Sequence, residues 1–338
     1  ILYGRTLEQT IDRYERATFV KEVVVTGGSV PLAMVRKRVA LRENDAPSPP
    51  VLLVHGFGQN RYAWHLPARS MANHLAYSGF DVWNLELRGH GRSAQFGAKP
   101  ARSVDDYVAE DLPRAVEEVL SHTGDRPIFL VGHSLGGLVC YASAPNLGDV
   151  VRGIVSLGSP YHFTRGSLSL QTLSLLFEGV RRAGVPHVGV GMPLYPVGAF
   201  MRVIRRLADS PFYPLPLRGW HRGALEPEVL EQHFRLAFDH AGLPEIRNMF
   251  EWAAHKRFGG HTRDYVERFE AMDVPLLVVA GKNDDLAPPA SVRPAYERSR
   301  STDKTYRTAA LGHIDLLVGR DAPTLTWPVV TEWLRARA

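Results

Sequence analysis

The heptapeptide VGHSLGG at residues 131–137 contains the pattern Gly-x-Ser-x-Gly, centred on Ser134. An apolar run precedes it at 128–131, and small residues compatible with a helix follow it at 138–142. A strand, a tight glycine turn and a helix in this order hold a serine on a strained turn with its hydroxyl exposed. The flanking glycines are needed because side chains there would collide with the adjoining strand or helix. The stretch therefore predicts a nucleophilic serine at Ser134.

Short apolar runs alternate with helical patterns on both sides of this motif. We expect strands at 22–26, 33–40, 51–54, 80–85, 128–131, 153–157, 275–280 and 305–311, and helices at 63–77, 104–120, 290–298 and 324–336. Continuous apolar strands that alternate with helices are typical of a parallel sheet with crossover helices. The predicted fold class is therefore α/β, with a mostly parallel central sheet flanked by helices.

The alternation stops between residues 161 and 262, where no buried strand is apparent. This segment instead contains four helical patterns separated by prolines and glycines, at 168–182, 197–208, 227–240 and 244–256. A block of about a hundred residues has the size of a small domain. We expect a helical cap at 161–262, inserted into a core formed by 1–160 and 263–338. The sequence Gly-Ser-Pro at 158–160 is the expected hinge.

Composition limits the class of protein. With 338 residues, 45% of them hydrophobic, the chain can bury a large core. The net charge of +5 is spread along the chain, and we expect no nucleic-acid partner because no Lys/Arg block occurs. A peripheral contact with an anionic membrane stays open beside an ordinary solvated basic surface. The sequence leaves the oligomeric state undetermined.

Location is predicted from cysteine use and hydropathy. Cys140 is the only cysteine, so an intramolecular disulfide is excluded and a reducing compartment is favoured. No apolar run is long enough to span a bilayer, and residues 1–5 do not resemble a signal peptide. We therefore expect a cytoplasmic protein, although the missing initiator Met leaves a trimmed leader open.

A nucleophilic serine needs a base, and the base needs an acid to orient it. The order expected along the chain is serine, then acid, then histidine, with the last two on loops that follow later strands. Asp284 and His313 meet both conditions. We predict that His313 accepts the proton of Ser134 and that Asp284 fixes the tautomer of His313.

Two other carboxylates near these loops have alternative interpretations. Asp285 adjoins Asp284, and only one of the pair can meet the histidine because neighbouring side chains point differently. We prefer Asp284, which stands three residues after Gly281 at the end of its strand. Asp315 is too close to His313 along the chain to reach across to it, so we expect it to cap a helix.

An oxyanion hole needs two preorganised backbone N–H groups that donate hydrogen bonds to the oxyanion. We expect one from Leu135, the residue after the nucleophile, and one from Phe57 in the glycine-rich loop 55–59 that follows the strand at 51–54. No spacing of His, Cys or Asp suggests a metal site, and we expect no cofactor.

These features together resemble the α/β-hydrolase superfamily, over nearly the whole chain outside 161–262. HGFG at 55–58 resembles its oxyanion loop, and RGHGRS at 88–93 resembles its R-G-x-G-x-S turn. The resemblance implies an α/β-hydrolase fold with Ser134, Asp284 and His313 as catalytic residues.

Two branches of the superfamily are similar. Residues 66–83 and NDDLA at 283–287 resemble acid lipases, and 80–93 resembles polyhydroxyalkanoate synthases. Those synthases use a cysteine nucleophile, whereas dehalogenases and epoxide hydrolases need an aspartate at the elbow. Ser134 therefore favours hydrolysis of an ester.

We expect a serine esterase or lipase that acts on a hydrophobic small-molecule ester. The segments 173–177 and 200–204 of the expected cap are rich in apolar residues, which suit either an apolar pocket or the core of the cap itself. Two alternatives stay open: acyl transfer through the same acyl-enzyme, and a non-catalytic ligand-binding member of the fold.

Overall fold

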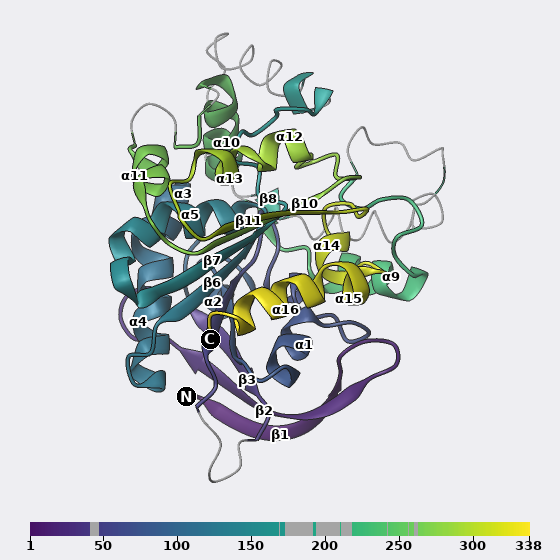
Figure 1. Cartoon of the computed structure of the whole chain (residues 1–338). Coiled ribbons are helices and arrows are strands. Elements are labelled where there is room, and N and C mark those ends of the chain that lie inside the picture. The colour runs from purple at the N-terminus through teal and green to yellow at the C-terminus, as the bar shows by residue number, and fades with distance from the viewer. Residues whose placement is uncertain are drawn as a thin grey trace.

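The computed structural model describes residues 1–40, 47–168, 170–172, 192–193, 210, 218–241, 243–255, 257–259 and 263–338. A single nine-stranded sheet runs through the molecule, with helices on both of its faces (Figure 1). Its strands lie in the order β1-β2-β3-β5-β4-β6-β7-β10-β11. The predicted α/β class with a mostly parallel sheet is confirmed.

The sheet has an antiparallel part and a parallel part. Strands β1 to β3 pair antiparallel with one another, and β3 pairs antiparallel with β5. From β5 onward every neighbouring pair is parallel. The bounds are β1 Tyr3–Thr10, β2 Arg16–Val25, β3 Ala33–Arg38, β4 Pro50–Val54, β5 Asp81–Glu86, β6 Ile128–His133, β7 Val151–Leu157, β10 Leu276–Gly281 and β11 Lys304–Ala309.

The central strands are apolar on both sides because helices cover both faces. In β4, Leu52 and Leu53 are fully buried but belong to two separate hydrophobic clusters, one on each face. One cluster is completed by α4 (Leu112–Thr123), α5 (Leu135–Leu147) and α11 (Tyr265–Ala271), and the other by α1 (Met71–Tyr77), α14 (Asp315–Val318), α15 (Ala322–Leu325) and α16 (Trp327–Arg335). Cys140 is fully buried in α5, as expected of a small core residue.

Sequence reasoning missed β1 altogether. Most of its residues are exposed, so it lacks the alternating apolar pattern that predicts a strand. The strand exists because its backbone pairs with β2 along its whole length, from Tyr3 opposite Val23 to Thr10 opposite Arg16. Backbone pairing of this kind leaves little trace in side-chain polarity.

The helix predicted at 63–77 is wrong in its first half. A short 3-10 turn, η1 (Arg61–Ala63), is followed by irregular chain that contains Pro67, and α1 begins only at Met71. Ser70 sets this start, because its side chain accepts a hydrogen bond from the N–H of Asn73 at 3.0 Å.

Other predicted helices are present but subdivided. Residues 104–123 form α3 (Val104–Asp106), the π-helical turn η2 (Tyr107–Asp111) and α4. Pro294 separates α12 (Pro289–Val292) from α13 (Pro294–Arg298), since proline cannot donate a helical hydrogen bond. Two further short helices are α2 (Gly91–Gln95) and η3 (Gly148–Val150).

Part of the expected cap can be compared with the structure. α9 (Pro227–Leu236) and α10 (Leu243–His255) match two of its four predicted helices. The predicted helix at 197–208 and most of the one at 168–182 lie outside the described residues. The two-residue strands β8 (Met192–Pro193) and β9 (His240–Ala241) pair with each other and not with the main sheet. The division into core and cap stays a prediction.

Candidate active site

Ser134 lies at the turn between β6 and α5 with φ 55° and ψ −123°. A positive φ is rare for a residue with a side chain and marks backbone strain. The neighbouring glycines make this turn sterically accessible. A Cβ on Gly132 would lie 2.4 Å from the N atom of Gly137, and a Cβ on Gly136 would lie 2.3 Å from the carbonyl oxygen of Val54.

Asp284 and His313 meet at the carboxyl end of the parallel strands. Nδ1 of His313 lies 2.7 Å from Oδ2 of Asp284, and both side chains are buried. The other carboxylate oxygen, Oδ1, accepts hydrogen bonds from the N–H groups of Leu286 at 2.9 Å and Ala287 at 2.7 Å. Because a carboxylate only accepts, Nδ1 of His313 is the donor in this bond, and Nε2 is the acceptor whenever the imidazole is neutral. Asp285 is exposed.

Three contacts place His313 beside the serine turn. The ring of His133, the residue before Ser134, lies 4.6 Å from the ring of His313, centroid to centroid. The N–H of Ser134 donates to the carbonyl of Leu157 at 3.0 Å. The next residue, Gly158, packs against the dyad, since a Cβ there would lie 3.3 Å from both Nδ1 of His313 and Oδ2 of Asp284.

The loop after β4 also passes beside Ser134. A Cβ on Gly56 would lie 3.0 Å from Cβ of Ser134. Phe57 follows in the same loop and is partly buried, while Leu135 is the first residue of α5 and is buried. The structure thus brings the segments of both expected oxyanion donors to the serine.

Two buried histidines close to the site, His55 and His133, lie within hydrogen-bond distance of the backbone of neighbouring loops. His55 donates from Nδ1 to the carbonyl of Gly56 at 2.9 Å and accepts from the N–H of Leu87 at 3.2 Å, and burial lowers its pKa to about 3. Burial also lowers the pKa of His133 well below its usual range. Both rings are therefore neutral. His313 stays the predicted base.

The turn at 88–93 is held by an ion pair and a hydroxyl. Nε of Arg88 donates to Oδ1 of Asp111 at 2.7 Å, and the backbone N–H of Arg88 donates to Oδ2 at 2.9 Å. Oγ of Ser93 accepts from the N–H of Ala33 at 2.8 Å. These contacts fix the turn to β3 and η2, which is a structural role.

The prediction that Asp315 caps a helix is wrong. Its Oδ2 accepts from the N–H of Gly312 at 2.8 Å and from the N–H of His221 at 2.7 Å, so it does not cap a helix. Burial raises its pKa to about 7. The carboxylate ties the loop that carries His313 to the segment around His221. Only the folded chain could reveal this link, because His221 is remote in sequence.

Among the described residues, no group of three or more His, Cys, Asp or Glu side chains is placed to share a metal ion. Among the described helices, none combines the length and apolar character required to cross a bilayer.

Known proteins that are similar to this chain include α/β hydrolases and lipases. A family model described as the alpha/beta hydrolase fold matches residues 49–186. A poly(3-hydroxyalkanoate) polymerase subunit from Haloferax mediterranei is 25% identical over 98% of this chain and 69% of that protein. Human lipase member K is 24% identical over 82% of this chain and 77% of that protein.

Solved structures share the fold. A monoglyceride lipase from Saccharomyces cerevisiae, solved in complex with a substrate analogue, superposes with a TM-score of 0.65. The match covers 97% of this chain and 99% of that one at 18% identity. Likeness at this level of identity supports a common architecture.

Proposed function

The chain belongs to the α/β-hydrolase superfamily, and we propose that it is a serine hydrolase that cleaves carboxylic esters. The observation that carries the proposal is the 2.7 Å hydrogen bond between His313 and Asp284, buried beside a serine with φ 55°. Nucleophile, base and orienting acid are the three groups that acyl transfer through a serine requires.

In the proposed first half-reaction, Oγ of Ser134 attacks the ester carbonyl while Nε2 of His313 takes its proton. The tetrahedral oxyanion is held by the N–H groups of Leu135 and Phe57. His313 then donates the proton to the departing alkoxide, which leaves as an alcohol with an acyl group on Ser134. Asp284 stabilises the imidazolium that forms in between.

In the second half-reaction, His313 removes a proton from water, and the resulting hydroxide attacks the acyl carbonyl. Collapse of this intermediate releases the carboxylic acid and returns the proton to Ser134. The exposed carboxylate of Asp285 takes no part.

We propose a hydrophobic small-molecule ester as the substrate and the segment 161–262 as a cap over the site. Apolar residues in that segment suit a pocket for an acyl or alkyl chain. The relatives named as lipases support the same class of substrate. Arg181, Arg182, Arg202, Arg205 and Arg206 give this segment a basic character in sequence, which would suit an acidic head group or an anionic surface.

Acyl transfer from the same acyl-enzyme is a second candidate, favoured by similarity to the polymerase subunit over 98% of the chain. An alcohol or amine would then replace water in the second half-reaction. The cysteine chemistry of such synthases is not available through Cys140, because this thiol is fully buried and burial raises its pKa.

A fluorophosphonate probe and a chain-length series of nitrophenyl esters test the proposal. We expect the wild type to be labelled and to turn over esters, and Ser134→Ala to do neither. Ser121→Ala, at an exposed serine on α4, is the matched control and should behave as wild type. Labelling that persists in Ser134→Ala would show that another serine is the nucleophile.

Product analysis with and without an alcohol acceptor separates the two candidates. Hydrolysis gives the free acid in both conditions, whereas acyl transfer gives a new ester when acceptor is present. A protein with neither turnover nor labelling would be a non-catalytic member of the fold.

A further inference from the structure

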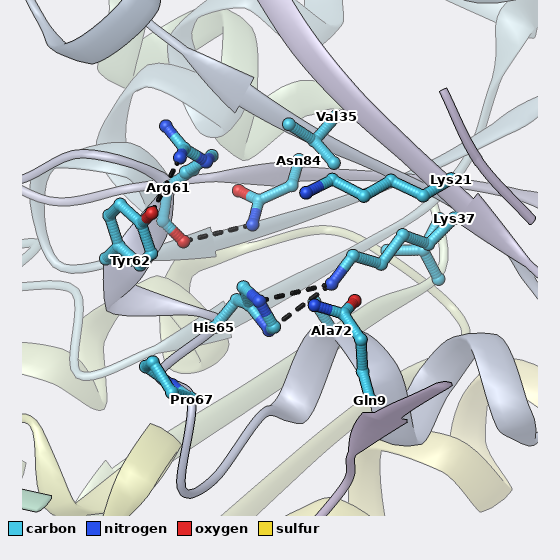
Figure 2. Close-up of a pocket in the computed structure, with 11 residues that line it drawn as sticks. Gln9, Lys21, Val35, Lys37, Arg61, Tyr62, His65, Pro67, Ala72 and Asn84 are labelled. Atoms are coloured by element: carbon cyan, nitrogen blue, oxygen red, sulfur yellow. Dashed lines mark hydrogen bonds between the residues drawn. The ribbon is translucent and has the colours of Figure 1, made fainter. Parts of the chain in front are cut away.

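A polar cavity lies at the antiparallel part of the sheet. It has a volume of about 180 Å³ and is lined by residues of β1, β2, β3 and β5 and of the segment 61–72 (Figure 2). This volume far exceeds the roughly 10–15 Å³ that one water needs, so a multi-atom ligand fits. Its described lining shares no residue with the proposed catalytic site.

Two lysines extend into this cavity from adjacent strands. Lys21 on β2 and Lys37 on β3 are directly opposite in the antiparallel register. Figure 2 shows their amino groups directed into the same space, toward His65 and Asn84. Like charges directly opposite each other across two strands destabilise a sheet. The repulsion between these two lysines destabilises the folded protein, and a bound anion would offset that destabilisation.

The lysines lack an acidic counterpart. Nζ of Lys37 donates to Oδ1 of Asn73 at 2.7 Å and lies 3.3 Å from each ring nitrogen of His65. Across the part of the chain that the structure describes, no carboxylate forms an ion pair with Lys21 or Lys37. Lys37 is only 2% exposed, and burial, followed by the charges of Lys21 and Arg61, lowers its pKa well below its usual range. An anion beside it would favour the protonated amine.

A third cation and the shifted pKa values indicate the same positive potential. Arg61 lines the cavity and donates to Glu86 at 2.8 Å, which is the only carboxylate contact it has among the described residues. Burial, followed by the charge of Arg61, lowers the pKa of Lys21 to about 8. Burial, followed by the charges of Lys37 and Lys21, lowers the pKa of His65 well below its usual range. His65 is therefore neutral.

Two buried acceptors in the lining indicate what else the ligand must offer. Oε1 of Gln9 and Oδ1 of Asn84 have no hydrogen-bond donor among the described residues. Nδ2 of Asn84 donates to the carbonyl of Arg61 at 3.0 Å, which fixes the orientation of this amide. A ligand that satisfies the cavity must accept from the lysines and donate to these oxygens.

We propose that this cavity binds a phosphate group, as inorganic phosphate or as a small phosphate monoester. Unprotonated phosphate oxygens accept from Lys21 and Lys37, and a protonated phosphate oxygen donates to Asn84 or Gln9. Carboxylate and sulfate are singly or doubly charged near neutral pH but have no proton to donate, so they satisfy only half of the site. The ligand enters at a rim where Pro67 is exposed and Arg61 and Tyr62 are partly exposed. The proposal does not depend on ester cleavage.

Isothermal titration calorimetry tests the assignment. The ligands are phosphate, a glycerol phosphate monoester and sulfate, each at constant ionic strength and near neutral pH. We expect saturable binding of phosphate or of the monoester that is about tenfold or more tighter than binding of sulfate. Comparison of the first two ligands identifies which of them the cavity prefers. Equal binding of sulfate and phosphate, or no saturable binding of either phosphate ligand, would overturn the proposal.

Variants locate the binding. Lys21→Met should weaken phosphate binding about tenfold or more, while the matched control Lys99→Met, at an exposed lysine, should bind as wild type. Lys21→Met removes no side-chain hydrogen bond seen among the described residues. Lys37→Met provides a second test if its circular dichroism matches wild type. Wild-type affinity in a folded Lys21→Met variant would place the anion elsewhere. Ester turnover, measured in parallel, should be unchanged in Lys21→Met.

Discussion

Charged groups are arranged in opposite ways in the two halves of the sheet. At the end of the parallel strands, the imidazole of His313 meets the carboxylate of Asp284, whose second oxygen accepts two backbone N–H groups. In the antiparallel half, Lys21 faces Lys37 across a strand pair with no carboxylate beside them among the described residues. In the first arrangement, opposite charges of the chain itself are paired. In the second, the positive charges need a bound anion to neutralise them.

This difference separates two kinds of site. Complementary groups hold each other in the geometry that a reaction needs, and they do so before any ligand arrives. Like charges around a cavity instead raise the free energy of the folded protein until an opposite charge binds. The two regions should therefore respond differently to substitution: the first in rate, the second in affinity and pH dependence.

Removal of the hydroxyl of Ser134, the proposed nucleophile, should have the largest effect. In Ser134→Ala we expect kcat for a nitrophenyl ester to fall about 10⁶-fold, because no other hydroxyl occupies the strained turn. Circular dichroism should be unchanged. A residual rate within about tenfold of wild type would assign the chemistry to another residue and break the comparison.

Asp284→Asn should lower kcat about 10⁴-fold, because an amide can donate to Nδ1 of His313 and so select the wrong tautomer. Asp285→Asn is the matched control, since Asp285 is adjacent but exposed, and its kcat should stay near wild type. Steady-state kinetics on both variants measure the difference. A reversed order would identify Asp285 as the acid.

Gly136→Ala should destabilise the protein by about 1–3 kcal/mol or more, because its Cβ would lie 2.3 Å from the carbonyl oxygen of Val54. Gly27→Ala is the control near the antiparallel half, where a Cβ would meet nothing within 4 Å. Urea unfolding of both variants measures the free energy. Equal stability would show that the serine turn has room to relax.

The smallest effect is the pH dependence contributed by Lys21. Its pKa is lowered to about 8 in the folded protein from an ordinary value of 10.5, so the unfolded chain holds the proton over this window and the folded one loses it. Stability should therefore rise as pH increases from about 8 to about 10.5, and this contribution should be absent in Lys21→Met. Lys21 is partly exposed, so screening limits the gain to about 1 kcal/mol.

Bound phosphate should change the pH dependence of stability that Lys21 contributes. A bound anion favours the charged lysine and raises its pKa, so saturating phosphate should flatten the rise in wild type. Urea unfolding at about pH 8 and about pH 10, with and without phosphate, measures it. Lys99→Met should keep the wild-type rise. Lys21→Met should show a smaller rise, since the pKa of Lys37 is also lowered and contributes to it. An undiminished rise in Lys21→Met would assign the rise to other groups.

The candidate catalytic site could be predicted from the sequence, whereas the lysine-lined cavity could not, because only the first is built from local sequence patterns. Gly-x-Ser-x-Gly, the loop of Asp284 and the loop of His313 are each local patterns placed directly after apolar strands. Parallel strands bring their carboxyl ends to one edge, so the order of these loops already indicates a shared location. The pairing of Lys21 with Lys37 depends instead on the register between strands, which polarity alone does not specify.

The same reasoning explains the errors in the fold. β1 was missed because its residues are largely exposed, and the helix at 63–77 was predicted too long because apolar spacing continues through an irregular segment with Pro67. The partners of Asp315 were missed because His221 approaches only in the folded chain.

By itself, the sequence determined the class of the sheet, the strained serine turn and the loops that carry Asp284 and His313, because each is specified by neighbouring residues. The tertiary structure decided which of two adjacent aspartates is buried against His313. It also decided which lysines face each other around a cavity. Both depend on side chains that are distant along the chain and meet only when backbone register and burial are fixed.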